Sequence, residues 1–286
     1  MTSENAPQVL SDQPDQDGTT KPTSINDYVV PEHPEGVRVG FGVDVGGSGI
    51  KGGRVDLSTG ELIGERIKIL TPKPATPEAV AAKIRKIIEI AQWDGPVGVT
   101  VPSVIRGQIA LSAANIDPSW VDTDCQALLA GLTPGNHTVT VLNDADAAGL
   151  AEAQFGPEQA RKGNVVMLTF GTGIGSALLH DGQLYPNSEI GHLLIDGKEA
   201  EHMASSRAKE TEELSYKKWA KRVSKVLQTY EVLLWPELFV VGGGISRKAH
   251  KWVDKLECRT PVVPATLNNN AGIAGAAYAA DQGLQP

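Results

Sequence analysis

Apolar positions along the chain follow two different periods. Residues 37–43 and 61–70 alternate apolar with small or polar side chains, which predicts strands. Over residues 76–91 apolar side chains recur every three or four positions, which predicts a helix that Thr76 can cap. With residues 50–57 as a second strand, the first part of the chain reads β-β-β-α-β. Short apolar runs predict further buried strands at residues 97–101, 138–142, 165–170, 238–241 and 261–264.

Two later stretches predict helices. Residues 214–230 are amphipathic, with Lys217, Lys221 and Lys225 at successive i+4 positions on the polar side. Residues 271–278 are mostly small, which suits tight packing. Strands that alternate with helices in this way predict an α/β fold. The lysine stripe is most simply a solvated face, but in an acidic chain it could also follow a long polyanion.

Composition narrows the class of protein. The chain has 286 residues, 41% of them apolar, which is enough for a substantial core and for two compact lobes. Its formal charge of −8 argues against a nucleic-acid partner and against an acidic membrane surface.

No apolar run approaches a membrane span, and no signal-peptide pattern is present. Cys125 and Cys258 are isolated, so we expect a cytoplasmic protein without a disulfide framework. Residues 1–36 are polar and aperiodic, and we expect a disordered tail there.

The first predicted strand runs into a turn whose side chains suit a phosphate group. Asp44 ends the strand, and its carboxylate suits Mg²⁺, bound directly or through water. Ser48 offers a hydroxyl and Lys51 a cation, while glycines can take positive φ and let backbone N–H groups approach a phosphate oxygen. The alternative is an ordinary β-hairpin, but the convergence of acid, glycines, hydroxyl and lysine favours phosphate binding. The glycines of this turn are Gly46, Gly47 and Gly49.

Two further glycine turns follow predicted strands. The strand at residues 165–170 leads into a turn of glycines and a hydroxyl and then into another strand, which repeats the layout of the first turn. The third turn follows the strand at residues 238–241, and a flat or phosphorylated group can lie against its backbone. Neither a Walker loop nor a Rossmann fingerprint is present, because the first turn continues into a strand rather than a helix. The residues of the second and third turns are Thr169, Gly171, Thr172 and Gly173, and Gly242, Gly243 and Gly244.

Polar side chains stand at other strand ends and in loops. Asp144 follows a buried strand and is our candidate for a catalytic base, although it or Asp146 could instead cap the next helix. Asn115 could bind a sugar hydroxyl or merely close its own turn. Glu189 and His192 could bind the same ligand, or their role could be structural only. The spacing of nearby acids and histidines is not that of a tetrahedral metal site.

Taken in order, these motifs resemble the ROK family of sugar kinases. A phosphate-binding turn inside a β-hairpin is also the pattern of the wider superfamily that includes actin and Hsp70. The matching stretches lie at residues 44–51, 143–147, 169–175, 189–192 and 241–246, and they span nearly the whole chain after residue 36. The branch of polyphosphate glucokinases and polyphosphate/ATP glucomannokinases is matched more narrowly at residues 204–210, 214–220 and 260–264.

The resemblance implies a fold and a division of the chain. It implies the actin-like ATPase (ribonuclease H-like) fold, with a mixed β-sheet flanked by helices in each of two lobes and a cleft between them. The small lobe would comprise residues 37–146 and be completed by the C-terminal helix at 270–286. The large lobe would comprise residues 147–269. A homodimer is implied as well.

The resemblance also implies an activity, the transfer of a phosphoryl group to the 6-hydroxyl of glucose. Asp144 would be the base, Mg²⁺ the cofactor near Asp44, and inorganic polyphosphate, ATP or both the donor, bound by the glycine turns. Most members of the family carry a cysteine-rich zinc motif after the Gly-His pair. Residues 193–207 contain no cysteine, so no structural zinc is expected. The implied glucose ligands are Ser103, Asn115, Asn143, Asp144, Glu189 and His192.

Other functions stay open at this stage. A kinase of mannose or another hexose would keep the same motifs. A sugar-sensing regulator would need an N-terminal DNA-binding domain, for which 36 polar residues are too few. An actin-like ATPase would keep the phosphate turns without a sugar site.

Overall fold

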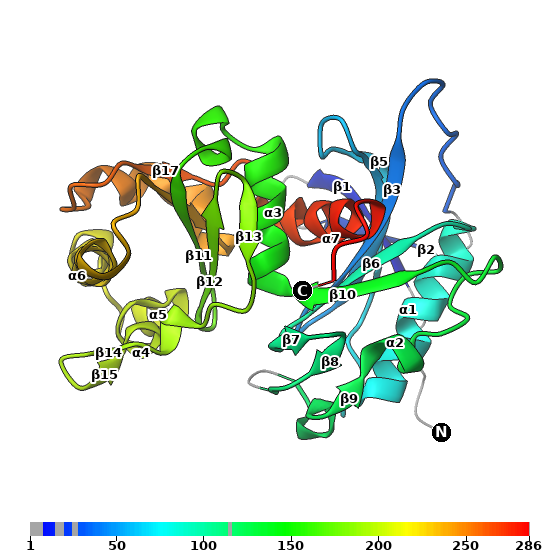
Figure 1. Cartoon of the computed structure of the whole chain (residues 1–286), viewed down its shortest axis with the longest axis horizontal. Helices are drawn as coiled ribbons and strands as arrows, with labels where there is room; N and C mark the ends of the chain where they lie inside the picture. Colours follow the sequence, from blue (N-terminus) through cyan, green and yellow to red (C-terminus); the bar gives the residue numbers. More distant parts are fainter. Residues whose placement is uncertain (1–7, 15–19, 25–27, 114–115, 286) are drawn as a thin grey trace. The chain divides into compact units, whose positions relative to one another are not determined.

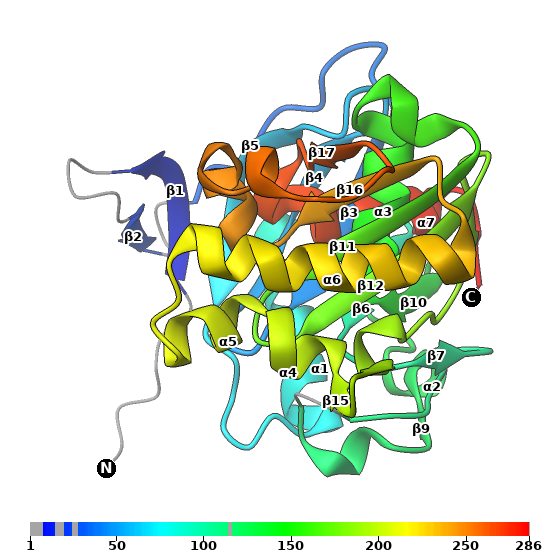
Figure 2. The same cartoon turned by 90° about the vertical axis from the view of Figure 1, so that its left-hand side faces the viewer.

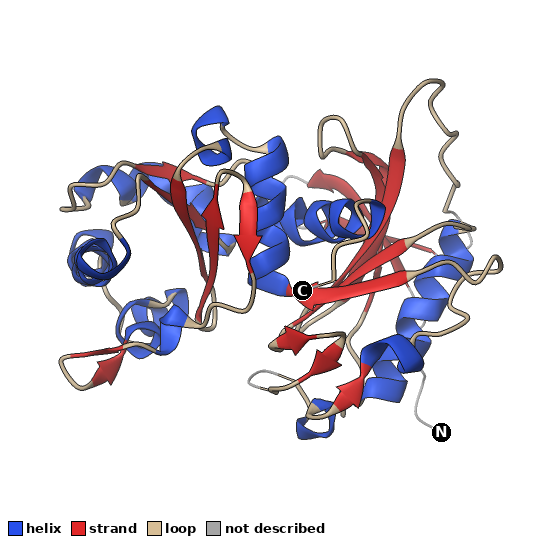
Figure 3. Ribbon diagram, viewed as in Figure 1, coloured by secondary structure: helices blue, strands red, loops and turns tan. Residues whose placement is uncertain are grey.

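The computed structural model describes residues 8–14, 20–24, 28–113 and 116–285 (Figure 1). The chain divides into two compact units: unit 1 is Met1–Ala147 with Gly272–Pro286, and unit 2 is Ala148–Ala271. Each unit has its own central sheet with helices packed on it, so the fold is of the mixed α/β class, as predicted (Figure 3). Among the described helices, none combines the length and the apolar character that crossing a membrane requires.

Unit 1 is built on a seven-stranded sheet in the order β10-β6-β3-β4-β5-β1-β2. The strands β3, β4 and β5 form an antiparallel meander, and β6 and β10 run parallel to β3. This is the predicted β-β-β-α-β order, because α1 connects β5 to β6. The strands are β1 (Gln8–Pro14), β2 (Thr20–Ser24), β3 (Val39–Val45), β4 (Ile50–Asp56), β5 (Leu62–Ile69), β6 (Val97–Val101) and β10 (Val139–Asn143).

Two helices pack on opposite faces of this sheet. On one face α1 (Pro77–Ala91) is capped by Thr76, which accepts a hydrogen bond from Ala79 N, as its sequence predicts. On the other face α7 (Ala271–Asp281) lies so close that a β-carbon on Gly98 would be 1.8 Å from the carbonyl oxygen of Ala276. The glycines of β3 and β6 therefore allow this small-residue helix to contact the sheet backbone. The remaining elements of unit 1 are β7 (Ile105–Arg106), β8 (Ile109–Ala110), η2 (Pro118–Trp120), β9 (Thr123–Asp124) and α2 (Cys125–Leu128).

The structure differs from the prediction at the N-terminal stretch. We predicted a disordered tail over residues 1–36, but β1 and β2 pair with each other there, and β1 pairs with the edge of β5. An edge strand offers unpaired backbone groups, and pairing with it requires no apolar period. A prediction based on hydrophobic periodicity therefore could not detect these strands.

Unit 2 is built on a five-stranded sheet in the order β13-β12-β11-β16-β17. In it β11, β16 and β17 are parallel, and β12 and β13 continue the sheet antiparallel. A separate hairpin, β14 with β15, lies outside this sheet. The strands are β11 (Asn164–Phe170), β12 (Ile174–His180), β13 (Gln183–Tyr185), β14 (Leu194–Ile195), β15 (Lys198–Glu199), β16 (Leu238–Gly242) and β17 (Val262–Pro264).

Helices cover both faces of the sheet in unit 2. On one face Gly149 of α3 (Asp144–Phe155) lies against Ala177. On the other face α6 (Tyr216–Leu234) crosses the strands, with α4 and α5 beside it (Figure 2). The amphipathic pattern predicted for this helix is confirmed, since its apolar side is buried. The other helical segments are η3 (Glu158–Arg161), η4 (Ile190–His192), α4 (Ala200–Ala204), α5 (Ser206–Thr211), η5 (Gly244–Lys251), η6 (Val253–Lys255) and η7 (Asn268–Asn270).

An aromatic cluster fixes the end of β11. Phe170, the last residue of that strand, meets Trp219 and Trp252 edge-on, with ring centroids 5.7 and 5.9 Å away. All three side chains are fully buried, and Trp219 donates to the carbonyl of Ala204 at 2.9 Å. Such contacts are worth about 0.5–1.5 kcal/mol per ring pair beyond burial. The second glycine turn therefore begins from a rigid support.

Candidate active site

The polar strand ends of unit 1 meet at one edge of its sheet. Because β3, β6 and β10 are parallel, their carboxyl ends lie together, with Asp44 level with Thr100 and Asn143 level with Val101. Two strand spacings separate β3 from β10, which is about 10 Å. The structure thus gathers the first glycine turn and the predicted base, Asp144, at the same edge.

The first glycine turn is a tight connection between β3 and β4. Its ends are tied by Gly46 N, which donates to the carbonyl of Gly49 at 3.2 Å, and by Thr71 Oγ1, which donates to the carbonyl of Gly46 at 2.5 Å. Glycine allows positive φ at this turn, but within the described chain the glycines with positive φ do not include those of this turn. A β-carbon on Gly47 would meet no atom within 4 Å, so this part of the turn borders open space. The backbone at Gly47 and Ser48 is exposed and open to a ligand.

The carboxylate of Asp44 is held from two sides. Thr100 Oγ1 donates to one oxygen at 3.0 Å, and Lys51 Nζ donates to the other at 3.3 Å. The Asp44 side chain is only 18% exposed. Gly272 leaves room for it, because a β-carbon there would lie 3.1 Å from an oxygen of Asp44. A carboxylate has further lone pairs, so this arrangement leaves Asp44 able to accept more ligands.

A second lysine at the turn was missed by the sequence analysis. Lys68 of β5 is opposite Lys51 of β4, and its side chain lies over Gly49, where a β-carbon would be 2.5 Å from Lys68 Cε. Burial lowers the pKa of Lys68, and the nearby charges of Lys51 and Arg66 lower it further. Only the register between β4 and β5 could have indicated that Lys68 lies at this turn. The turn therefore has two ammonium groups rather than one.

A pocket of about 230 Å³ opens beside this turn. Gly46 and Gly47 form one wall, and the proline-containing segment of residues 71–75 forms another. Pro102, which follows β6, and Ile116 with Asp117 complete it. The pocket belongs wholly to unit 1, and it brings a ligand-sized volume against the exposed glycine backbone.

At the end of β10, the side chains of Asn143, Asp144 and Asp146 have different environments. Asn143 Oδ1 accepts from Ala145 N at 2.8 Å and from Asp146 N at 3.2 Å, so Asn143 caps α3. The cap that we considered for Asp144 or Asp146 thus belongs to Asn143, and the helix begins at Asp144. Asp144 itself is exposed, whereas Asp146 is fully buried. An exposed acid at the first residue of a helix, beside the glycine turn, is a suitable position for a base.

Ser103 is a supporting residue in this geometry. Its hydroxyl is buried and donates to the carbonyl of Ser112 at 2.7 Å, and its own carbonyl accepts from Asn143 Nδ2 at 3.1 Å. The hydroxyl proton is therefore committed to the loop after β6. Asn115, the other loop residue that the family resemblance implies, lies outside the described residues.

The two glycine turns of unit 2 are neighbours at one sheet edge. Thr169 of β11 is level with Gly242 of the parallel strand β16, so the turns that follow these strands lie side by side. The β11–β12 turn is closed by Gly171 N, which donates to the carbonyl of Gly173 at 3.0 Å. Gly243 has φ +82°, and a β-carbon there would lie 2.3 Å from the carbonyl oxygen of Phe170. Only glycine fits that position.

Next to these turns, His192 lies among carboxylates. His192 Nδ1 is 3.0 Å from Glu199 Oε2, and its Nε2 is 3.9 Å from Glu189 Oε2. The hydrogen bond with Glu199 raises the pKa of His192, aided by the charges of Glu201 and Glu189. Burial raises the pKa of Glu189, partly opposed by His192. A carboxylate beside an imidazolium offers both an acceptor and a donor to a polyol.

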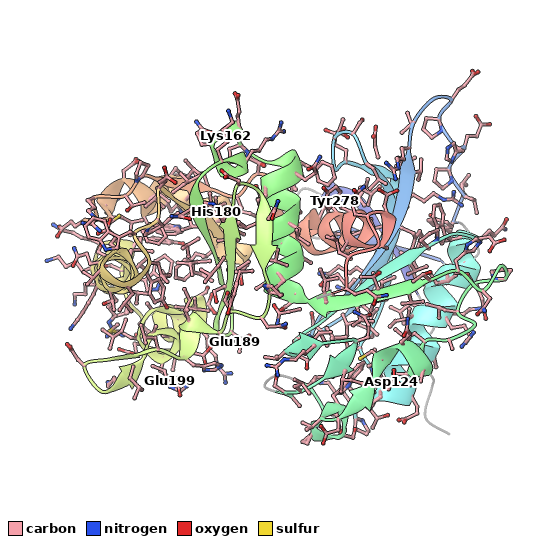
Figure 4. All side chains as sticks on the ribbon, viewed as in Figure 1. Asp124, Lys162, His180, Glu189, Glu199 and Tyr278 are labelled. Carbon is pink, nitrogen blue, oxygen red and sulfur yellow. The ribbon has the colours of Figure 1, made fainter. Side chains whose placement is uncertain are left out.

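Glu201 connects this group to the second glycine turn. Its Oε2 accepts from Ile174 N at 3.3 Å, and a β-carbon on Gly173 would lie 2.2 Å from the same oxygen. Its Oε1 is 3.9 Å from His192 Nδ1. The ligand atoms of His192, Glu199 and Glu201 lie within 4.8 Å of one another, but these contacts explain their positions without a metal ion. Sequence reasoning did not give Glu199 or Glu201 a role, because both act through contacts across elements. Figure 4 labels Glu189 and Glu199, which lie at the same end of unit 2.

The family model described as ROK family matches residues 40–208 of the chain. The chain belongs to the ROK family. A ROK relative named polyphosphate glucokinase, from Mycobacterium tuberculosis, is 58% identical over 242 residues, which cover 85% of this chain and 91% of the relative. The crystal structure of an inorganic polyphosphate/ATP-glucomannokinase from Arthrobacter sp. strain KM is 47% identical, with a TM-score of 0.80 over 86% of this chain and 99% of that one. A ROK family glucokinase from Streptomyces griseus, crystallised with glucose and AMPPNP, shares the fold at 24% identity and a TM-score of 0.71. The match covers 86% of this chain and 100% of that one. The actin-like ATPase fold expected of the ROK family is thereby confirmed.

The environment of His192 leads to a prediction about its titration. In a Glu199→Gln variant the pKa of His192 should fall, because the imidazolium loses its nearest carboxylate. NMR titration of the His192 ring protons measures this, with Glu212→Gln, an exposed acid paired with Arg222, as the matched control.

The same change has a consequence for stability with a definite sign. Because the pKa of His192 is raised in the folded state, its protonation stabilises the fold below the unfolded pKa, and this contribution is lost as pH rises through the folded pKa. The difference in free energy of unfolding between the wild type and Glu199→Gln should therefore shrink over that window. An unchanged His192 titration in the variant would contradict this account.

Proposed function

We propose that this ROK protein is a glucokinase that transfers the terminal phosphoryl group of inorganic polyphosphate, and also of ATP, to the 6-hydroxyl of glucose. The observation that carries the proposal is an exposed carboxylate, Asp144, at the same sheet edge as a glycine turn with two ammonium groups. The similarity to the Mycobacterium polyphosphate glucokinase and to the Arthrobacter glucomannokinase supports the choice of donor and acceptor.

In this proposal Asp144 is the general base. Its carboxylate accepts the proton of the sugar 6-hydroxyl as that oxygen attacks the terminal phosphorus in line. One O–P bond forms, and the bond to the bridging oxygen of the donor breaks, so the shortened donor leaves with the bonding electrons. Asp144 then returns its proton to water. Its Oδ1 accepts a hydrogen bond from Ala145 N at 3.0 Å, which helps to orient the carboxylate.

The phosphate end of the donor is assigned to the glycine turns. In unit 1 the exposed backbone at Gly47 and Ser48 and the ammonium groups of Lys51 and Lys68 would meet developing negative charge. In unit 2 the N–H groups of the second and third turns serve the same purpose, with Thr172 adding a hydroxyl. Little covalent chemistry is required of the protein, so positioning and charge supply most of the acceleration.

Asp44 fits a magnesium ion that is bound together with substrate phosphates. Mg²⁺ commonly takes one or two protein carboxylates and fills its other positions with water and phosphate oxygens, and Asp44 is a partly exposed carboxylate at the phosphate turn. When bound, the ion would neutralise charge on the donor phosphates. Asp44 would hold it, and Thr100 and Lys51 keep the carboxylate in place.

Each unit, taken by itself, supplies candidate contacts for sugar hydroxyls. In unit 1 these are Asn143 and Asp144, with Ser103 as the support of Asn143. In unit 2, Glu189 accepts and His192 donates hydrogen bonds, with Glu199 fixing the imidazole. Mannose differs from glucose at the 2-hydroxyl, and the glucomannokinase similarity makes it the second candidate substrate. A homodimer, which the family resemblance implied, stays part of the proposal.

The function is tested by supplying each donor alone. Purified protein with Mg²⁺ and glucose should form glucose 6-phosphate with long-chain polyphosphate and, in a separate reaction, with ATP, followed by coupled reduction of NADP⁺. Mannose in place of glucose tests the second candidate. Hydrolysis of either donor at the same rate without sugar, and no sugar phosphate, would disprove a kinase.

Replacement of the base should separate catalysis from binding. Asp144→Asn should lower kcat by about 10²–10⁴-fold with both donors, the usual cost of losing a positioned base, while the Kd for glucose changes little. Coupled assays and calorimetry measure the two quantities. Asp254→Asn, at an exposed acid of η6, is the matched control. A near-normal kcat in Asp144→Asn would remove Asp144 from this role.

A further inference from the structure

Two helical segments of unit 2 start at its two glycine turns. Arg207 of α5 donates its backbone N–H to the carbonyl of Gly171 at 3.1 Å, so the start of α5 touches the second turn. The segment η5 begins at Gly244, inside the third turn. Because these turns are neighbours at the sheet edge, α5 and η5 lead away from the same place.

Both segments bring a lysine to one tyrosine. Lys209 Nζ of α5 lies 4.4 Å from the ring centroid of Tyr216, and Lys251 Nζ, at the end of η5, lies 5.8 Å from it. Tyr216 is the first residue of α6, and its ring is half-buried. An aromatic ring can fix an ammonium group by a cation–π contact while leaving its N–H donors free. The lysines are therefore positioned without being neutralised.

The segments α5 and η5 carry more cations than acids, while Glu210 lies on α5 and Glu212 and Glu213 follow it. Arg247 and Lys248 lie on η5 and Arg207 on α5, and all three are exposed. Among the described residues, neither Lys209 nor Lys251 has a carboxylate within ion-pair distance. In a protein with a formal charge of −8, such a cluster marks a place for an anion.

The cations of α6 are less available to bind an anion than the sequence indicates. Arg222 forms a two-pronged ion pair with Glu212, and Lys225 is paired with Asp196. Two of the cations of α6 are thus paired with acids. The exposed lysines of this helix without an ion pair in the described part of the chain are Lys217, Lys218 and Lys221, all close to Tyr216.

We propose that Lys209, Tyr216 and Lys251 form a subsite for the part of an inorganic polyphosphate chain that lies beyond the reacting phosphate. This inference rests on the proposed function and extends it to the path of the donor. A linear polyphosphate carries negative charge on every repeating unit, so it can use two ammonium groups that lie apart. The terminal phosphates bind at the glycine turns, and the following ones lie between α5 and η5. ATP, with three phosphates, does not need this subsite.

The subsite is tested by a Lys209→Ala/Lys251→Ala double variant. Its KM for long-chain polyphosphate should rise roughly 2- to 30-fold, the range for losing two partly exposed charge contacts. Its KM for ATP and for glucose, and its kcat with ATP, should stay within about twofold. A Lys209→Arg/Lys251→Arg variant keeps the charge and should retain most of the polyphosphate affinity.

A matched control is available at the far end of the same sheet. Lys162 is exposed and precedes β11, whereas the second glycine turn follows that strand, so about 20 Å separate them. Figure 4 shows Lys162 at the end of unit 2 opposite Glu189 and Glu199. Lys162→Ala removes one exposed lysine and should leave every KM unchanged.

Direct binding keeps this inference separate from the proposed function. Calorimetric titration with long-chain polyphosphate requires no turnover, so it tests the subsite even if the protein phosphorylates no sugar. Weaker binding in the double variant, with an unchanged thermal melt, supports the subsite. Equal polyphosphate affinity in the two proteins overturns it. An equal rise in the KM for ATP also overturns it, because the lysines would then serve the phosphates common to both donors.

Discussion

The phosphate end of unit 1 depends on the way the Asp44 carboxylate is held between two neighbouring strands. Thr100 on β6 binds one of its oxygens and Lys51 on β4 the other, so the carboxylate is fixed by strand register and not by its own turn. A slip of one residue between β3 and β4 would turn Asp44 to the other face of the sheet. The glycines of β3 and β6, which admit α7 to the same sheet, help to exclude such a slip.

Each unit has a glycine turn at the end of its sheet, and different contacts hold the turn in each. Each places a glycine turn at the carboxyl end of its sheet, where backbone N–H groups can face a phosphate. In unit 1 the turn is anchored by ion pairs and by Thr71. In unit 2 it is anchored by buried aromatic rings behind Phe170 and by Glu201 in front. The second turn has no lysine of its own, and the nearby cations come instead from α5 and η5.

Features that depend on neighbouring residues in the chain were predicted well. The strands on both sides of each glycine hairpin and the cap at Thr76 follow from local patterns, and the family resemblance supplied the fold. The glycine turns lie between the elements that the sequence predicted, and among the turn glycines only Gly243 has positive φ. A β-carbon on Gly242 would meet Met167, whereas one on Gly47, Gly171 or Gly244 would meet no atom within 4 Å.

Features that depend on contacts between distant residues could not be predicted. Lys68 reaches the first turn because β5 pairs with β4, and Glu201 reaches the second because α4 packs beside it. Asn143 caps α3 because β10 extends to Asn143 and the helix begins directly after it, at Asp144. None of these has a signature in a single stretch of sequence. They follow from register and packing, which no local period encodes.

In the proposed function Asp44 positions the donor phosphates and has no part in glucose binding. The most direct test is to measure kcat/KM for polyphosphate and for ATP, together with the Kd for glucose, in an Asp44→Asn variant. The account predicts that kcat/KM falls about 10²–10³-fold with both donors, because charge next to the transferring group is lost, while glucose binds as before. Unchanged kcat/KM with either donor, or lost glucose binding with intact donor kinetics, would contradict it.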